Sequence, residues 1–206
     1  MRFSDLLGKL ERQGVTVSSV DSMEDLSSCD AVVMLGLQQF SEQQAIALHR
    51  FLKNGGALFA AIADAAMSVD AGDSNFDVSA EGTLAGIGLN LSAVLESYGI
   101  SVQKLVVIDP KNEIEGSLAW MTSGGYGEHP IVLGFQDHRA SVWALPWAIK
   151  GGVPLVNASS SGWAESNITA ALRGETVEPS ADELLMPRAV AVAAEKNKTR
   201  IVVLGS

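Results

Sequence analysis

The first half of the chain has the apolar pattern of alternating strands and helices. The uninterrupted apolar run at 31–36 predicts a strand buried on both faces. Ser41 and Gln44 have the spacing of a capping box, which starts a helix with apolar residues at 45, 48, 51 and 52, and Asn54-Gly55-Gly56 ends it. The run at 57–63 predicts a second buried strand. We therefore expect a β-α-β unit with parallel strands and a right-handed crossover.

Further elements flank this unit. Helical spacing predicts helices at 4–13 and 90–98, ended by Gly14 and Gly99. Alternation predicts a strand at 15–20, and a further strand is expected at 102–108. The stretch 64–88, between the strand at 57–63 and the helix at 90–98, is rich in Gly and Asp and has no helical or strand period. A loop of this length is usually functional or mobile.

Short strands separated by Gly and Pro follow Pro110. The apolar runs at 129–133, 141–149, 153–156 and 189–193 predict strands, and a brief helix is expected at 181–185. The pattern predicts an α/β fold with an open, mostly parallel sheet and a β-richer second half. We expect one domain over 1–206, in which a β-α-β core at 1–110 continues into a β-rich part at 111–206.

Composition narrows the classes of partner. The 206 residues include 14 Lys and Arg against 24 Asp and Glu, so the net charge of −10 disfavours a nucleic-acid surface. Apolar residues make up 47% of the chain, which is ample for a buried core. Cys29 is the only cysteine, so the chain forms no internal disulfide and no CxxC site.

The apolar segment at 57–67 contains Asp64 and is shorter than the ~18–20 residues of a membrane span. The apolar run at 200–206 has nothing after it to cover it. We therefore expect this chain to be a fragment of a longer, membrane-associated protein, with membrane contact only through segments outside it.

The acidic loop at 70–77 carries oxygen ligands at near-alternate positions. A calcium loop that starts at Asp73 would need Gly at its sixth position and Glu at its twelfth, but the chain has Val78 and Leu84 there. A solvated loop is therefore the default interpretation. His129 and His138 lack the spacing of a zinc motif, and no metal or cofactor is predicted.

Two other functions stay open. Ser160 or Ser161, together with His129 and an acid, would suit a hydrolase or amidotransferase-like enzyme, although no G-x-S-x-G elbow occurs. The four tryptophans could instead line a carbohydrate-binding groove, although core packing is the commoner role of such residues. They are Trp120, Trp143, Trp147 and Trp163.

Several segments in order resemble one known family, the GldG-like auxiliary proteins of ABC-type transport systems, named for bacterial gliding motility. The similar segments are 30–36, 40–44, 50–59, 90–100, 106–109, the HPI turn at 129–131, the WAE turn at 162–166 and the strand at 200–206. No single segment is specific, whereas their order and spacing are.

The resemblance implies a non-catalytic extracytoplasmic (periplasmic) domain of a bacterial inner-membrane protein. Its sheet would be flavodoxin-like or class I glutamine-amidotransferase-like. The implied role is interaction or ligand binding in an auxiliary subunit, and the implied partners are ABC permease and ATPase subunits or other envelope components. The family supplies no catalytic residues to carry over.

A parallel sheet binds ligands at the carboxyl ends of its strands. That rule, the long loop and the similar turns together give the candidate binding residues. They are Gly36, Gln38, Gln39, Asp64, Asp70, Asp73, Asn75, Asp77, Asp109, His129, Trp163 and Glu165.

Overall fold

Two sheets and the helices around them form the structure, a computed structural model. It describes residues 3–20, 23, 26–36, 41–62, 89–114, 117–135, 140–172 and 175–206. The helices described are α1 (Phe3–Arg12), α2 (Glu42–Lys53), α4 (Leu89–Glu96) and α5 (Ile168–Leu172), with 3-10 turns η1 (Leu133–Phe135) and η2 (Glu183–Leu185). No helix in these ranges is both long enough and apolar enough to span a bilayer.

Nine of the strands described form the larger sheet, in the order β1-β2-β12-β11-β8-β3-β10, with β9 beside β11 and β6 beside β9. They are β1 (Ala31–Leu35), β2 (Ala57–Ala61), β3 (Ser101–Ile108), β6 (Gly125–Tyr126), β8 (Trp147–Lys150), β9 (Val153–Asn157), β10 (Trp163–Glu165), β11 (Ala189–Lys196) and β12 (Thr199–Leu204). The smaller sheet contains β4 (Glu113–Ile114), β5 (Ser117–Thr122) and β7 (Val142–Ala144).

The β-α-β unit is confirmed. Ser41 Oγ accepts a hydrogen bond from the Gln44 amide, and the Gln44 side chain accepts one from the Ser41 amide, so the capping box forms as expected. Gly55 (φ +97°) follows the end of α2 in the left-handed region. β1 and β2 pair in parallel, with Val33 opposite Phe59.

The expected flavodoxin-like, mostly parallel sheet is wrong. Only β1-β2 and β2-β12 are parallel pairs among the strands described, and the other pairs are antiparallel. The reason is the β11–β12 hairpin, whose turn contains Asn197 at φ +58° and which returns β12 alongside β2. β3 therefore pairs with β8 and β10 instead of joining the parallel strands.

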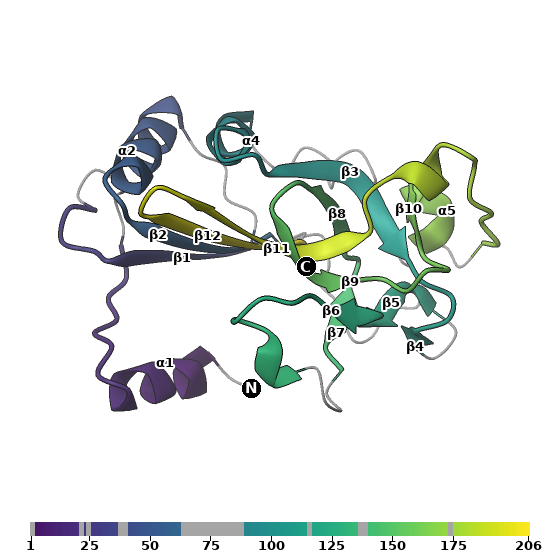
Figure 1. The fold of residues 1–206 in the computed structure, drawn as a ribbon, viewed down its shortest axis with the longest axis horizontal. Coiled ribbons are helices and arrows are strands. Elements are labelled where there is room, and N and C mark those ends of the chain that lie inside the picture. The colour runs from purple at the N-terminus through teal and green to yellow at the C-terminus, as the bar shows by residue number, and fades with distance from the viewer. Residues whose placement is uncertain are drawn as a thin grey trace, which may run out of the picture.

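Two expectations about the first half are also wrong. Among the strands described β1 is at the edge of the sheet, and Val33 and Leu35 are exposed instead of buried, because they lie on the face of the sheet opposite α2 and α4 (Figure 1). Residues 15–20 form no strand, and Val15, Val17 and Val20 are exposed. Alternation alone does not make a strand when no neighbouring strand supplies hydrogen bonds.

In the second half, prolines interrupt some of the strands that the apolar runs predict. The run at 141–149 is split at Leu145-Pro146 into β7 and β8, which belong to different sheets, and Leu145 adopts φ +46°. Residues 129–133 form a turn leading into η1 instead of a strand, and α5 was not expected. The strands at 153–156 and 189–193 are confirmed as β9 and β11.

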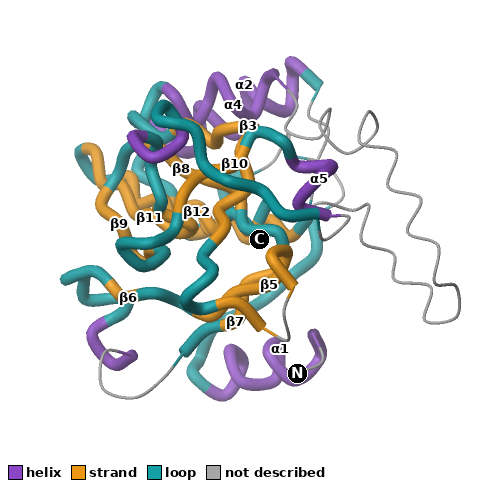
Figure 2. Tube along the Cα trace, turned by 90° about the vertical axis from the view of Figure 1, so that its right-hand side faces the viewer, coloured by secondary structure: helices purple, strands orange, loops and turns teal. Residues whose placement is uncertain are grey.

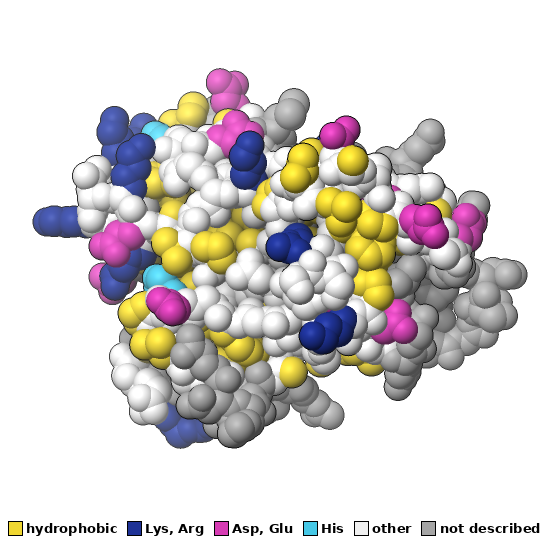
Figure 3. Space-filling view, turned by 45° about the vertical axis from the view of Figure 1, so that its right-hand side comes forward, with side chains coloured by type: hydrophobic (Ala, Val, Ile, Leu, Met, Phe, Trp, Pro, Cys, Tyr) yellow, Lys and Arg dark blue, Asp and Glu magenta, His cyan; other side chains and the backbone are white. Residues whose placement is uncertain are grey.

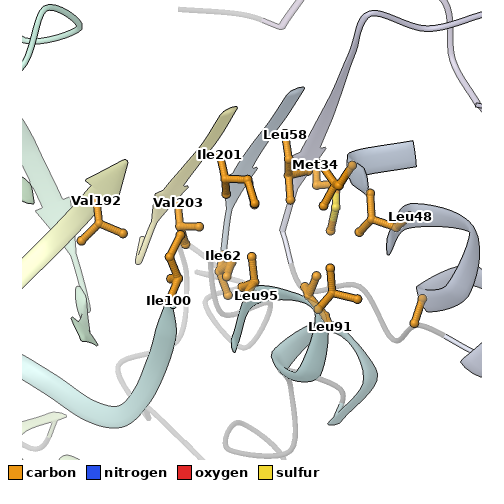
Figure 4. Close-up of a cluster of buried hydrophobic side chains, with 14 of the residues drawn as sticks. Met34, Leu48, Leu58, Ile62, Leu91, Leu95, Ile100, Val192, Ile201 and Val203 are labelled. Carbon is orange, nitrogen blue, oxygen red and sulfur yellow. The ribbon is translucent and has the colours of Figure 1, made fainter. Parts of the chain in front are cut away.

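Helices α2 and α4 lie on one side of the larger sheet and α1 on the other (Figures 1 and 2). Between α2, α4 and the sheet is the main apolar core, where Leu48, Leu58, Leu95 and Ile201 are almost fully buried (Figure 4). Each such side chain contributes roughly 1.5–3 kcal/mol by leaving water. The Thr199 hydroxyl donates to the Leu52 carbonyl and links the end of α2 to the start of β12.

We predict that Gly151→Ala destabilises the fold. Gly151 lies between β8 and β9 at φ +87°, and a methyl group there would be 1.9 Å from the Gly99 carbonyl oxygen. Backbone strain plus this overlap predicts a loss of about 2 kcal/mol or more in the free energy of unfolding, measured by urea denaturation. Gly134→Ala is the control, because open space surrounds that position. Equal unfolding midpoints for the two variants would contradict the prediction.

Candidate functional site

Three of the predicted site residues come together where β3 meets β10. Trp163 pairs with Ile108, and Glu165 pairs with Val106. Asp109 follows Ile108 at the end of β3 and is therefore next to the start of β10. Gly36 follows β1, and its amide donates to the Ala61 carbonyl. The other residues predicted in these loops lie outside the described residues: Gln38, Gln39, Asp64, Asp70, Asp73, Asn75 and Asp77.

The expected crevice at the carboxyl ends of the strands is not a single site. In sheet order β1 and β3 are separated by β2, β12, β11 and β8. At ~4.8 Å per strand this places Gly36 and Asp109 roughly 24 Å apart along the sheet. The rule for parallel sheets does not apply to β3, because both of its neighbours are antiparallel.

Asp109 is the centre of a polar cluster, here called the Asp109 cluster, which contains Asp109, Asn112, Ser159 and Ser161. Asp109 is 1% exposed. Oδ1 accepts from the Ser159 hydroxyl at 2.7 Å, and Oδ2 accepts from the Ser159 amide at 2.6 Å and the Asn112 side chain at 2.8 Å. The carboxylate therefore binds the loop that follows β9 to the end of β3.

These bonds also set the charge of Asp109. Burial raises the pKa of Asp109, but hydrogen bonds from the Ser159 amide, the Asn112 side chain, the Ser159 hydroxyl and the Lys111 amide outweigh burial. The pKa of Asp109 therefore lies below its ordinary value. A carboxylate held in its charged form in this way is a weak general base.

The serine-rich loop is positioned by backbone contacts as well. The Ser159 and Ser161 hydroxyl oxygens lie 2.9 Å apart. Arg188 Nη1 donates to the carbonyls of Ser159, Ser160 and Gly162, at 3.2, 2.8 and 3.4 Å. The loop is therefore held by its own polar groups, a structural role that accounts for the Ser-rich sequence.

His129 does not join these serines. The Gly127 amide donates to the carbonyl of Leu155, which precedes Ser159 by four residues, or roughly 13 Å of extended chain. The two segments run antiparallel, so His129, two residues after Gly127, lies farther still from Ser159. His129 Nδ1 accepts from the Ile131 amide within its own turn. The arrangement therefore does not favour a triad of Ser160 or Ser161 with His129.

A second cluster of Ser166, Ser180 and Glu183, here called the Glu183 cluster, holds the segment before β11. Glu183 is 9% exposed, and its two oxygens accept from the amides and hydroxyls of Ser166 and Ser180 at 2.7–2.9 Å. The Ser166 hydroxyl and the Ser180 and Ser166 amides lower the pKa of Glu183 to about 2. The capping-box spacing of Ser180 and Glu183 is the signal for this cluster in the sequence.

Glu165 and the tryptophans are mainly structural. Glu165 is buried and accepts from the Trp163 indole at 3.0 Å and the Asn167 amide at 2.6 Å. Trp143, Trp147 and Trp163 are buried, and only Trp120 is exposed, at 39%. Core packing is therefore favoured over a carbohydrate groove. Across the described ranges no three His, Cys, Asp or Glu side chains group so that they could hold a metal ion.

The family follows from comparison with known proteins. The model of the family described as ABC-type uncharacterized transport system, ABC_transp_aux, matches residues 2–141. The chain belongs to this family. Membership in ABC_transp_aux gives the chain a transport-associated accessory role and associates it with an ABC transport system. The match includes Asp109 and His129 but not Trp163, Glu165 or the Glu183 cluster.

One solved structure shares the fold of this ABC_transp_aux member. The chain is similar to the "mmIFT52 N-terminal domain" with a TM-score of 0.56 and 16% sequence identity, over 98% of this chain and 78% of that one. At this identity the likeness shows the fold alone. Among curated proteins there is no match.

We predict that Asp109→Asn destabilises the chain through the loop after β9. The amide keeps one oxygen for the Ser159 and Asn112 nitrogens but replaces the other with a donor facing the Ser159 hydroxyl, and the charge that strengthens all of these hydrogen bonds is lost. The expected loss is about 2 kcal/mol in the free energy of unfolding at neutral pH, measured by urea denaturation. Asp182→Asn, at an exposed carboxylate, is expected to change little. If both variants unfold at the wild-type midpoint, Asp109 does not hold this loop.

The depressed pKa of Glu183 predicts a pH dependence of stability. The contribution of Glu183 is complete above its ordinary pKa of 4.5 and is lost as the pH falls toward about 2. Glu183→Gln is therefore less stable than wild type at neutral pH, and the difference shrinks as the pH falls from 4.5 toward 2. Thermal unfolding across this range measures it, with Glu178→Gln as the exposed control. A gap that stays constant with pH would show that the charge is not involved.

Proposed function

We propose that this chain is a non-catalytic interaction domain of an ABC-transport auxiliary protein, and that it binds its transport-system partner through the outer edge of β1. The partner contributes an extended segment of the permease. The domain belongs to the extracytoplasmic side of a bacterial inner membrane. The segments similar to GldG-like proteins, such as 40–44 and 50–59, support the gliding-motility type and this location.

The exposed edge of β1 carries the proposal. β1 pairs with β2 on one side and with no described strand on the other. Val33 is 59% exposed and Leu35 44%, and Phe59 of β2, opposite Val33, is 36% exposed. These side chains alternate with the buried Met34, so they form an apolar strip on the face of the sheet opposite α2 and α4.

The residue types at this edge support docking by an extended chain. Natural edge strands are usually guarded by charges, prolines or bulges, since an open edge pairs with other strands. The sequence Ala-Val-Val-Met-Leu of β1 has none of these guards. An added strand would gain backbone hydrogen bonds from the edge and would cover the apolar strip with alternate side chains.

The polar clusters support the non-catalytic part of the proposal. The oxygens of Asp109 and Glu183 accept hydrogen bonds from loop amides and hydroxyls, and both carboxyls have lowered pKa values. Neither is set up as a general acid or base near neutral pH. The Asp109 and Glu183 clusters hold loops in place.

The test is Val33→Lys in the full-length auxiliary protein, produced together with its permease and ATPase. A lysine at the edge opposes strand addition and places charge on the apolar strip. We expect recovery of the partner subunits to fall about tenfold, which corresponds to a loss of ~1.4 kcal/mol in binding. Quantitative co-purification measures it.

Ile46→Lys is the matched control, because Ile46 is 51% exposed on α2, which lies on the other face of the sheet from the apolar strip (Figure 1). It should leave co-purification unchanged. Full recovery of partners with Val33→Lys, or an equal loss with Ile46→Lys, would overturn the proposal. The exposure of both positions makes misfolding a minor concern, and circular dichroism of the purified variants checks it.

A further inference from the structure

A cavity of about 480 Å³ lies where the parallel strands begin. The segment before β1 lines it with Leu26, Cys29 and Asp30, α2 and the turn after it with Arg50 and Asn54, and β12 with Arg200. Its size is within the range of small-molecule sites. It is separate from the Asp109 and Glu183 clusters, none of whose residues line it.

The fold brings the two arginines to this cavity from distant parts of the sequence. Arg200 pairs in register with Ala57, directly after the turn that ends α2. The Thr199 hydroxyl donates to the Leu52 carbonyl, and a methyl group on Gly55 would lie 3.2 Å from Lys198 Cβ. The end of α2 and the start of β12 are therefore in direct contact.

Positive charge gathers here on an acidic chain. The net charge is −10, yet Arg50, Lys53, Lys198 and Arg200 all lie on the two segments that meet at the cavity. Figure 3 shows Lys and Arg side chains gathered toward the left of the view, the side on which α2 lies in Figure 1, with a few acidic side chains among them. Acidic side chains lie among these positive ones, because Asp30 lines the cavity and Glu195 is opposite Arg200 in the β11–β12 pair.

Both guanidinium groups are available to a ligand. Neither the Arg50 nor the Arg200 side chain forms a hydrogen bond or ion pair with another residue in the described part of the chain. The carbonyls at the end of α2 already accept hydrogen bonds from backbone amides, so they do not need the guanidinium groups as donors. The Asn54 amide donates to the Arg50 carbonyl, the Gly55 amide to the Leu52 carbonyl and the Gly56 amide to the Phe51 carbonyl. The negative end of the helix is thus already capped.

We propose that this cavity binds one oxyanion group, a phosphate or a carboxylate, of a small molecule. Two guanidinium forks match the planar or tetrahedral oxygens of such a group. Asp30 lines the same cavity, so the formal charge of its titratable lining is two positive and one negative. This balance fits a single oxyanion better than a polyanion. The site is additional to the β1 edge, and its test does not depend on partner binding.

Cys29 provides the reporter, because it lines the cavity and is the only cysteine of the chain. The rate of alkylation by N-ethylmaleimide, an uncharged reagent, is measured alone, with inorganic phosphate, with acetate, and with chloride at matched ionic strength. We expect phosphate or acetate to slow the reaction several-fold more than chloride does. Whichever protects better identifies the preferred oxyanion.

The variants are Arg50→Gln and Arg200→Gln, with Lys104→Gln on β3 as a control that removes one charge elsewhere. Each arginine variant should weaken binding of the protective anion about tenfold, as expected for the loss of one charge-assisted contact. Lys104→Gln should bind that anion as the wild type does. Equal slowing by chloride, or protection unchanged in both arginine variants, would overturn the proposal.

A second measurement uses the wild-type chain, so it does not depend on whether the variants fold. The guanidinium Nε–Hε signals of Arg50 and Arg200 in the wild-type chain, assigned by NMR, should shift on addition of phosphate or acetate and saturate. Signals that move only in proportion to ionic strength would overturn the proposal as well. A loss of partner binding in Val33→Lys with intact Cys29 protection would separate the two sites.

Discussion

Backbone pairing of β12 on both of its sides is the constraint on which the larger sheet depends. Along Arg200–Leu204 the strand bonds in parallel to β2, and along Thr199–Leu204 it bonds antiparallel to β11. Without it β2 and β11 would each expose a row of buried amides and carbonyls, which is costly. The first and last parts of the chain therefore share one sheet, and the core under α2 contains Leu58 from β2 beside Ile201 from β12.

Local signals in the sequence were reliable because local physics decides them. The Ser41–Gln44 capping box, the glycine after α2 and the apolar stripe of that helix involve residues only a few positions apart. Strand neighbours are set by contacts across more than a hundred residues, as between β2 and β12. Apolar runs identify such strands but not which strand lies next to which, and this is why β1 was expected to be buried.

The candidate site shows the same division. Asp109, Trp163 and Glu165 were expected as binding residues and do lie together, but their contacts are internal. Glu183 was missed, because its spacing from Ser180 indicates only a local cap until the fold brings Ser166 to the same carboxylate. Serine hydroxyls serve equally as nucleophiles and as donors to a buried carboxylate, so the Ser159–Ser161 run alone did not distinguish a reaction from a structural contact.

The open edge of β1 has a consequence for the amount of the protein in a cell. A strand without charge or proline at its outer side is a template for any other extended chain, including the same strand of another copy. Chains made in excess over their partner would therefore tend to associate edge to edge as their concentration rises. If a partner covers this edge as proposed, synthesis of the two proteins in equal amounts would keep the pool of uncovered edges small.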